Sequence, residues 1–132
     1  MAIFIGREPS IRSLLQAYLE TLNFRLESAA TEQEMNQLYS TRNPALIIFD
    51  VSYQMEKDMD QLREICALDS RKGIPVIALI SHGDCNTLQS LSDYGVSDYF
   101  TKPLDFQAFD TFFIEKIGNV ASIPNAERKK FL

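Results

Sequence analysis

The chain has 132 residues, 45% of them hydrophobic, and a formal net charge of −5. These values predict one globular domain that buries its own core, and the acidic balance argues against a nucleic-acid-binding surface, which needs clustered Lys and Arg. No apolar run approaches the roughly 20 residues of a membrane span, and the N-terminus lacks a secretory signal. We therefore expect a cytoplasmic protein without a membrane or nucleic-acid partner. Cys66 and Cys85 match no metal-binding spacing and are expected to be reduced, inert thiols.

The first third of the chain alternates strand and helix patterns. Residues 2–5 form a short apolar run typical of a strand, and Pro9 then suits the first turn of a helix. That helix is predicted by apolar residues spaced three and four apart: Ile11, Leu14, Leu15, Tyr18, Leu19 and Leu22. Asn23 ends it, and residues 24–29 alternate as in an edge strand. Residues 31–34 have capping-box spacing and begin a second helix.

The centre of the chain is a continuous apolar run, residues 45–49, that ends at Asp50. A run with neither helical period nor polar alternation predicts a strand buried on both faces, as in a parallel sheet. Residues 75–80 repeat this pattern after a third helix expected at 58–68. Ligands collect at the carboxyl ends of such strands, so Asp50 is the first candidate site residue. A strand-end Asp that only caps a turn is the alternative.

The last third predicts a fourth helix from Asp84 to Tyr94, a strand at 97–101 and a final helix beginning near Asp105. The apolar face of the final helix carries Phe106, Phe109, Phe113 and Ile117. We expect one domain over residues 1–119 and a polar, basic tail or linker over 120–132. Regular strand–helix alternation predicts an α/β fold with a parallel sheet covered on both faces.

Five short motifs in this order resemble the receiver domain of bacterial two-component response regulators. They are Glu8-Pro9-Ser10-Ile11-Arg12, Leu46-Ile47-Ile48-Phe49-Asp50, Ile74-Pro75-Val76-Ile77-Ala78-Leu79, His82-Gly83-Asp84 and Tyr99-Phe100-Thr101-Lys102-Pro103-Leu104. The resemblance covers residues 2–118. It implies a flavodoxin-like, doubly wound sheet of five strands in the order 2-1-3-4-5 with five helices.

The resemblance also implies roles for single residues. Asp50 would accept a phosphoryl group from a histidine kinase, and Lys102, followed by Pro103, would contact that group. Tyr99 takes the place of the switch aromatic, and the carbonyl of Ser52 that of a metal ligand. Phosphoryl transfer to a carboxylate crowds negative charge, so it needs a divalent cation and a fixed ammonium group.

Three positions depart from the family pattern. Receivers carry two acids that hold Mg²⁺ where this chain has Gly6 and Arg7. The family's Ser/Thr at the end of the fourth strand maps to Ile80, and Ser81 lies one residue further, which turns its side chain to the other face. We therefore expect no metal ligand set and Mg²⁺ binding that is lost or weak.

These departures predict an atypical receiver, or pseudo-receiver: a non-enzymatic module that acts by protein–protein contact with a histidine kinase or an effector domain. Arg7 could neutralise Asp50 in place of the metal, or it could point into solvent. The alternative function keeps Asp50 as a working phosphoacceptor, with Glu8 and water completing an abnormal metal site. A flavin or nucleotide protein would need a Gly-rich phosphate loop after the first strand, which Gly6 alone does not provide.

Four further side chains have two interpretations each. His82 is best explained as an ordinary loop residue rather than a catalytic one. Tyr99 is expected to be fixed by packing rather than to switch. Phe112 and Ile114 flank the apolar face of the last helix, where they could extend the core or form a docking surface for a homodimer.

Overall fold

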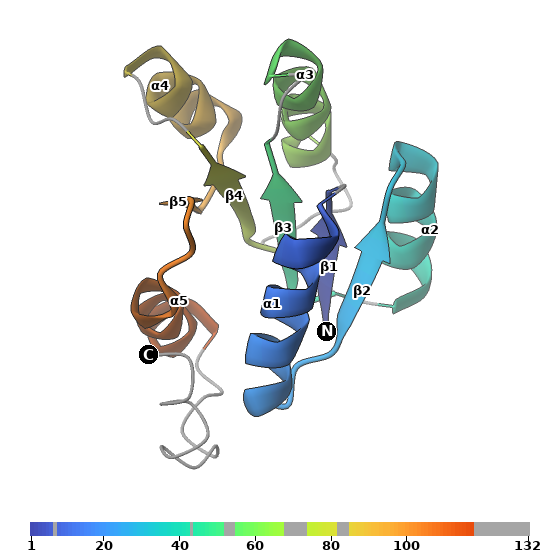
Figure 1. Ribbon diagram of the computed structural model, residues 1–132. Coiled ribbons are helices and arrows are strands. Elements are labelled where there is room, and N and C mark those ends of the chain that lie inside the picture. The colour runs from blue at the N-terminus through green and yellow to red at the C-terminus, as the bar shows by residue number, and fades with distance from the viewer. Residues whose placement is uncertain (7, 43, 52–54, 68–73, 82–84, 118–132) are drawn as a thin grey trace.

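The computed structural model describes residues 1–6, 8–42, 44–51, 55–67, 74–81 and 85–117 (Figure 1). The strands are β1 (Ala2–Ile5), β2 (Leu26–Ala29), β3 (Leu46–Asp50), β4 (Val76–Ile80) and β5 (Asp98–Thr101). The helices are α1 (Pro9–Thr21), α2 (Glu32–Arg42), α3 (Met55–Cys66), α4 (Cys85–Tyr94), α5 (Phe106–Phe112) and the π-helical turn η2 (Phe113–Ile117). No helix within these ranges is long and apolar enough to cross a membrane.

All five strands are parallel and lie in the order β2-β1-β3-β4-β5. This order confirms the predicted flavodoxin-like sheet. The register pairs Ile5 with Phe49 and Asp50 with Leu79. The carboxyl ends of β1, β3 and β4 therefore meet at one edge, and Asp50 stands at the centre of that edge.

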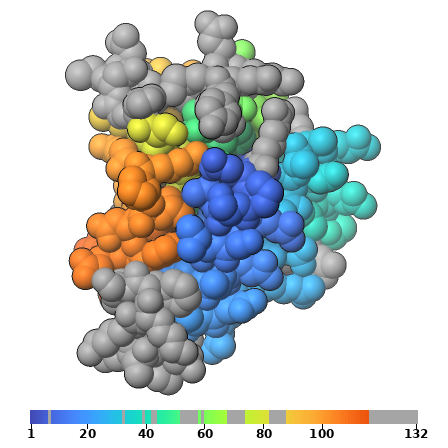
Figure 2. All heavy atoms as spheres, in the orientation of Figure 1, coloured from blue at the N-terminus to red at the C-terminus, as the bar shows by residue number. Residues whose placement is uncertain are grey.

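Two apolar cores lie on opposite faces of the sheet. One is formed with α1 and α5, and the other with α2, α3 and α4. Because alternate strand residues point to opposite faces, Phe4 and Ile48 enter the first core while Ile5 and Phe49 enter the second. Figure 2 shows α1 and α5 side by side on one face of the molecule, where Tyr18 stacks on Phe106 at a centroid distance of 4.8 Å.

Four local start and stop signals are confirmed, and the fifth, Asp84, lies outside the described residues. Pro9 lies in the first turn of α1, and Asn23 ends that helix region with a φ of 56°. At the start of α2 the Thr31 hydroxyl accepts from the Glu34 N–H at 3.2 Å. Asp105 caps α5 by accepting from the Gln107 N–H at 3.0 Å.

Two elements begin two or three residues away from the predicted start, and the other starts agree to within about one residue. The third helix begins at Met55 rather than Asp58, because residues 55–57 are good helix formers that look like a polar loop in sequence. The second strand begins at Leu26 because Phe24 turns into the first core, with its ring 5.5 Å from that of Phe113.

The last helix separates the two interpretations of Phe112 and Ile114. Phe112 is only 3% exposed, whereas Ile114 is 53% exposed. Phe112 is buried because its ring meets Phe100 and Phe113 edge-on, at centroid distances of 6.0 and 5.8 Å. Phe112 therefore extends the core, the first of its two interpretations. The docking alternative is contradicted for Phe112, and Ile114 remains available for such a surface.

Candidate functional site

Asp50 is held rigidly at the end of β3. The N–H of the next residue, Val51, donates to the Leu79 carbonyl at 2.9 Å, so strand pairing continues past the carboxylate. The Asp50 side chain is fully buried. The predicted acid is thus fixed at the carboxyl edge of the sheet and enclosed by the protein.

Lys102 supplies the cation that Asp50 contacts. Its backbone N–H donates to the Ile80 carbonyl at 2.9 Å, which anchors the residue beside β4, and a cis peptide bond joins it to Pro103. The Lys102 Nζ lies 2.5 Å from Asp50 Oδ1 and 3.7 Å from Glu8 Oε2. The structure therefore brings together three of the predicted site residues, Asp50, Lys102 and Glu8, from three separate segments.

The environment of Asp50 disfavours the ionised form of its carboxyl group. Burial raises the pKa of the Asp50 carboxyl, and the negative charges of Glu8 and Asp58 raise it further, while Lys102 acts in the opposite direction. Oδ2 has no hydrogen-bond partner among the described residues. One lysine thus compensates only part of the cost of burying this carboxylate.

The space around Gly6 tests whether this chain could carry the first of the two metal-binding acids in the family pattern. A Cβ atom added at Gly6 would lie 2.7 Å from Phe4 Cζ and 2.9 Å from Asp50 Cβ, both shorter than real Cβ contacts. An acidic side chain there has no room. Among the described residues no group of three or more His, Cys, Asp or Glu could hold a metal ion. In the part of the chain that the structure describes, this edge of the sheet therefore has no space for the first of the two acids in the family pattern.

Asp58 is a site residue that sequence reasoning treated only as a helix start. It is 7% exposed on α3. Together with Gly6, Asp50 and Gln61 it lines a cavity of about 10 Å³, enough for roughly one water molecule. The sequence does carry a signal for the position of Asp58 beside Asp50. The helix after β3 starts at the same edge of the sheet as Asp50, so an acid in its first turns lies close to that residue.

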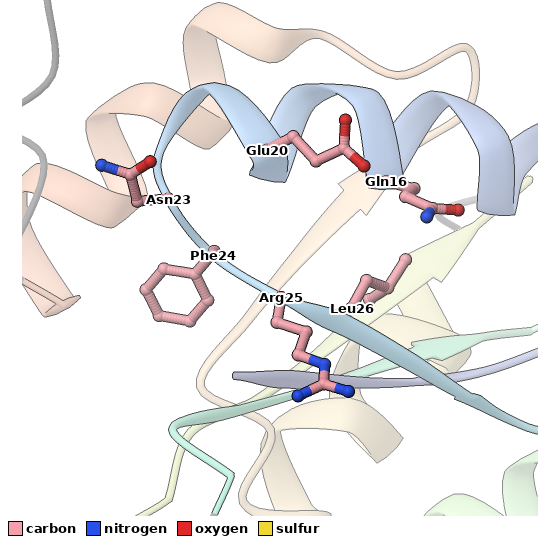
Figure 3. A pocket seen from close by; sticks show the side chains of 6 residues that line it. All are labelled: Gln16, Glu20, Asn23, Phe24, Arg25 and Leu26. Atoms are coloured by element: carbon pink, nitrogen blue, oxygen red, sulfur yellow. The ribbon is translucent and has the colours of Figure 1, made fainter.

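Two larger hollows are lined by described residues. One of about 400 Å³ adjoins the site, and it is lined by Phe4, Gly6, Glu8, Pro9, Arg12, Ser28, Ala29, Ala30 and Glu34. The other, of about 410 Å³, is shown in Figure 3, with Gln16 and Glu20 on α1 above the segment Phe24 to Leu26. This second hollow lies where β2 begins, at the opposite edge of the sheet from Asp50, and contains none of the predicted site residues.

The remaining predicted site residues lie apart or outside the described ranges. Ile80 is fully buried in the core with α2, α3 and α4, and Ser81 is exposed. Tyr99 is 42% exposed, and the fixing of its rotamer by packing stays a prediction. Arg7, Ser52 and His82 fall outside the described residues.

Comparison with known proteins decides the family. Residues 3–112 match the response regulator receiver domain family. The chain belongs to this family. A curated relative of the receiver is the regulatory protein LuxO of Vibrio cholerae, which is 23% identical over 96 residues. That match covers 73% of this chain but only 21% of LuxO, so the receiver spans about a fifth of that relative's length.

Solved structures share the receiver fold. The chemotaxis response regulator CheY4 of Vibrio cholerae matches with a TM-score of 0.73 at 17% identity, covering 86% of this chain and 95% of that one. The receiver domain of an HD domain-containing protein from Pseudomonas fluorescens gives 0.75 at 20% identity, with coverages of 88% and 92%. The receiver domain of a histidine kinase from Syntrophus aciditrophicus gives 0.72 at 22% identity, with coverages of 94% and 95%. At these identities the matches establish the fold.

Proposed function

We propose that this receiver domain is an atypical module of two-component or phosphorelay signalling, in which Mg²⁺-dependent phosphorylation is weak or absent. It acts by binding other signalling proteins rather than as an enzyme. No Mg²⁺ or other cofactor is needed for this role.

One observation carries the proposal: other side chains occupy the space that the family's first metal-binding acid would need. Gly6 stands at that position, and Phe4 and Asp50 occupy the space that a side chain there would need. Arg7 follows in the position of the second acid. Mg²⁺ prefers octahedral oxygen ligands and relies on carboxylates plus water and phosphate, so losing both acids removes most of the protein's share of the coordination.

A second candidate function keeps Asp50 as a phosphoacceptor. It is favoured by the contact between Lys102 Nζ and Asp50 Oδ1 at 2.5 Å, since a lysine in this place could stabilise a phosphoryl group. Glu8 would then have to serve as a metal ligand. Its carboxylate instead lies 3.7 Å from Lys102 Nζ and its side chain is 44% exposed, which favours the first proposal.

Receiver domains work with histidine kinases or effector domains, and we propose a partner of one of these kinds, in the cytoplasm. Ile114, an exposed apolar side chain of η2, is a candidate contact for such a partner or for a second copy of the chain. Arg7 would contribute by neutralising Asp50, which would make the resting state independent of metal.

The direct test is exposure of the protein to acetyl phosphate and Mg²⁺, followed by intact-mass spectrometry. We expect no phosphoryl adduct in the wild type, as in an Asp50→Asn control. An adduct in the wild type that the Asp50→Asn variant lacks would restore the second function.

A further inference from the structure

The ring of Phe4 lies where a side chain at position 6 would have to go. Residues two apart on a strand point to the same face, so Phe4 and position 6 share the face that carries the first core. A Cβ atom at position 6 would meet Phe4 Cζ at 2.7 Å and Phe4 Cε1 at 3.1 Å. It would also meet Asp50 Cβ at 2.9 Å. Position 6 is therefore pinched between an aromatic ring and the phosphoacceptor-equivalent residue.

Neither the Phe4 ring nor Asp50 Cβ can easily move away from position 6. Phe4 is 1% exposed and belongs to the core formed with α1 and α5. Asp50 Cβ is fixed by β3, which pairs with β1 and β4 on its two sides. Protein interiors pack at crystal-like density, so an extra side chain must displace one of these two groups.

We infer that Phe4 determines the loss of divalent-cation binding at this site, because its ring excludes an acid from position 6. This inference rests on the proposed function and adds a residue to it: changing Gly6 and Arg7 back to acids is not sufficient while Phe4 is present. Leucine at position 4 would keep the core apolar but carries no atoms where Phe4 Cζ and Cε1 lie. The end of β1 could then move into the vacated space, which would also relieve the contact with Asp50 Cβ.

The test measures Mn²⁺ binding by paramagnetic broadening of the Asp50 and Val51 amide signals in four variants. All carry Arg7→Asp, so that the arginine does not differ among them. The first has no other change, the second adds Gly6→Asp, the third adds Phe4→Leu, and the fourth adds both. We expect the second variant to have the same Mn²⁺ dissociation constant as the first. The fourth variant should bind Mn²⁺ about tenfold tighter than the first.

Stability provides a readout that does not depend on metal. Gly6→Ala should lower the urea midpoint of the wild-type protein and lower it clearly less in a Phe4→Leu background. Phe100→Leu is the matched control, because Phe100 belongs to the same core but is not among the nearest neighbours of a Cβ at Gly6. In that background Gly6→Ala should lower the midpoint as much as in the wild type.

The inference is overturned if Gly6→Asp tightens Mn²⁺ binding equally with Phe4 and with Leu at position 4, or if Gly6→Ala costs the same in both backgrounds. Failure of the proposed function has a different signature. It would appear as saturable Mn²⁺ binding by the unmodified wild-type protein, whatever the four variants do.

Discussion

At the scale of single residues, Asp50 carries a charge that the fold compensates incompletely. Its side chain is fully buried, Lys102 contacts one carboxylate oxygen, and the other has no hydrogen-bond partner among the described residues. Burial is the main cause of its raised pKa. The Asp50 carboxyl therefore binds a proton more tightly in the folded protein than in the unfolded chain.

Asp50→Asn should stabilise the protein at neutral pH. With a raised folded pKa, the contribution of Asp50 to stability is complete below about pH 4 and is lost as the pH rises through that pKa. Removing the charge should raise the free energy of unfolding at pH 7 by on the order of 1 kcal/mol. Urea unfolding between pH 4 and pH 8 checks this, with the exposed-acid variant Asp60→Asn as the control. An Asp50→Asn protein that is less stable than wild type at pH 7 would contradict it.

Lys102→Met should have the opposite effect. Loss of the ammonium group removes the only counter-ion that the described residues give the buried Asp50 carboxylate, and breaking a buried pair in this way costs about 3 kcal/mol. In an Asp50→Asn background the cost should fall by more than about 1 kcal/mol, because the two residues are directly coupled. Chemical denaturation of the four proteins in this cycle measures the coupling. Equal costs of Lys102→Met in the two backgrounds would show that the pair does not matter for stability.

At the scale of elements, α5 is held by aromatic packing rather than by its length. It has seven residues and continues into the π-helical turn η2. Phe109 stacks on Phe100 with a centroid distance of 4.2 Å and an interplanar angle of 15°, and it also meets Phe106 at 5.8 Å. Short helices are marginal alone, so these rings fix the position of α5.

Phe109→Ala should therefore destabilise the protein by about 3–5 kcal/mol, the usual cost of a large cavity in a core. Ile114→Ala, on the exposed side of η2, should change the free energy of unfolding by no more than about 0.5 kcal/mol. Thermal or urea unfolding of both variants checks the contrast. Similar losses in the two would mean that the aromatic cluster does not anchor the helix.

The elements also show where sequence patterns succeed and fail. The apolar runs of β3 and β4 and the spacing of α1 were sufficient to predict these elements. A strand buried on both faces leaves a continuous apolar run, and a helix buried on one face leaves apolar residues three and four apart. The sequence left open whether Phe112 is buried or exposed, because the buried arc of the last helix depends on Phe100, which comes from β5. The widening of the helix at η2 leaves no such signal in the sequence.

At the scale of the whole molecule, the motifs and their order predicted the receiver fold and placed Asp50 with Lys102, and the structure shows the two in contact. The pinch at Gly6 could not be predicted, because it depends on how closely the ends of β1 and β3 approach in three dimensions. The burial of Asp58 beside the site has the same origin. Sequence patterns identify the residues, and the tertiary fold sets the space between them.

The central claim is that Asp50 of this receiver is not phosphorylated in an Mg²⁺-dependent reaction. The most direct measurement is a titration of the wild-type protein with Mg²⁺ and beryllofluoride, a phosphoryl analogue, followed by backbone amide chemical shifts. We predict no saturable change at Asp50, Val51 or Lys102. A saturable change at these amides that Asp50→Asn abolishes would contradict the claim and identify a working phosphoacceptor.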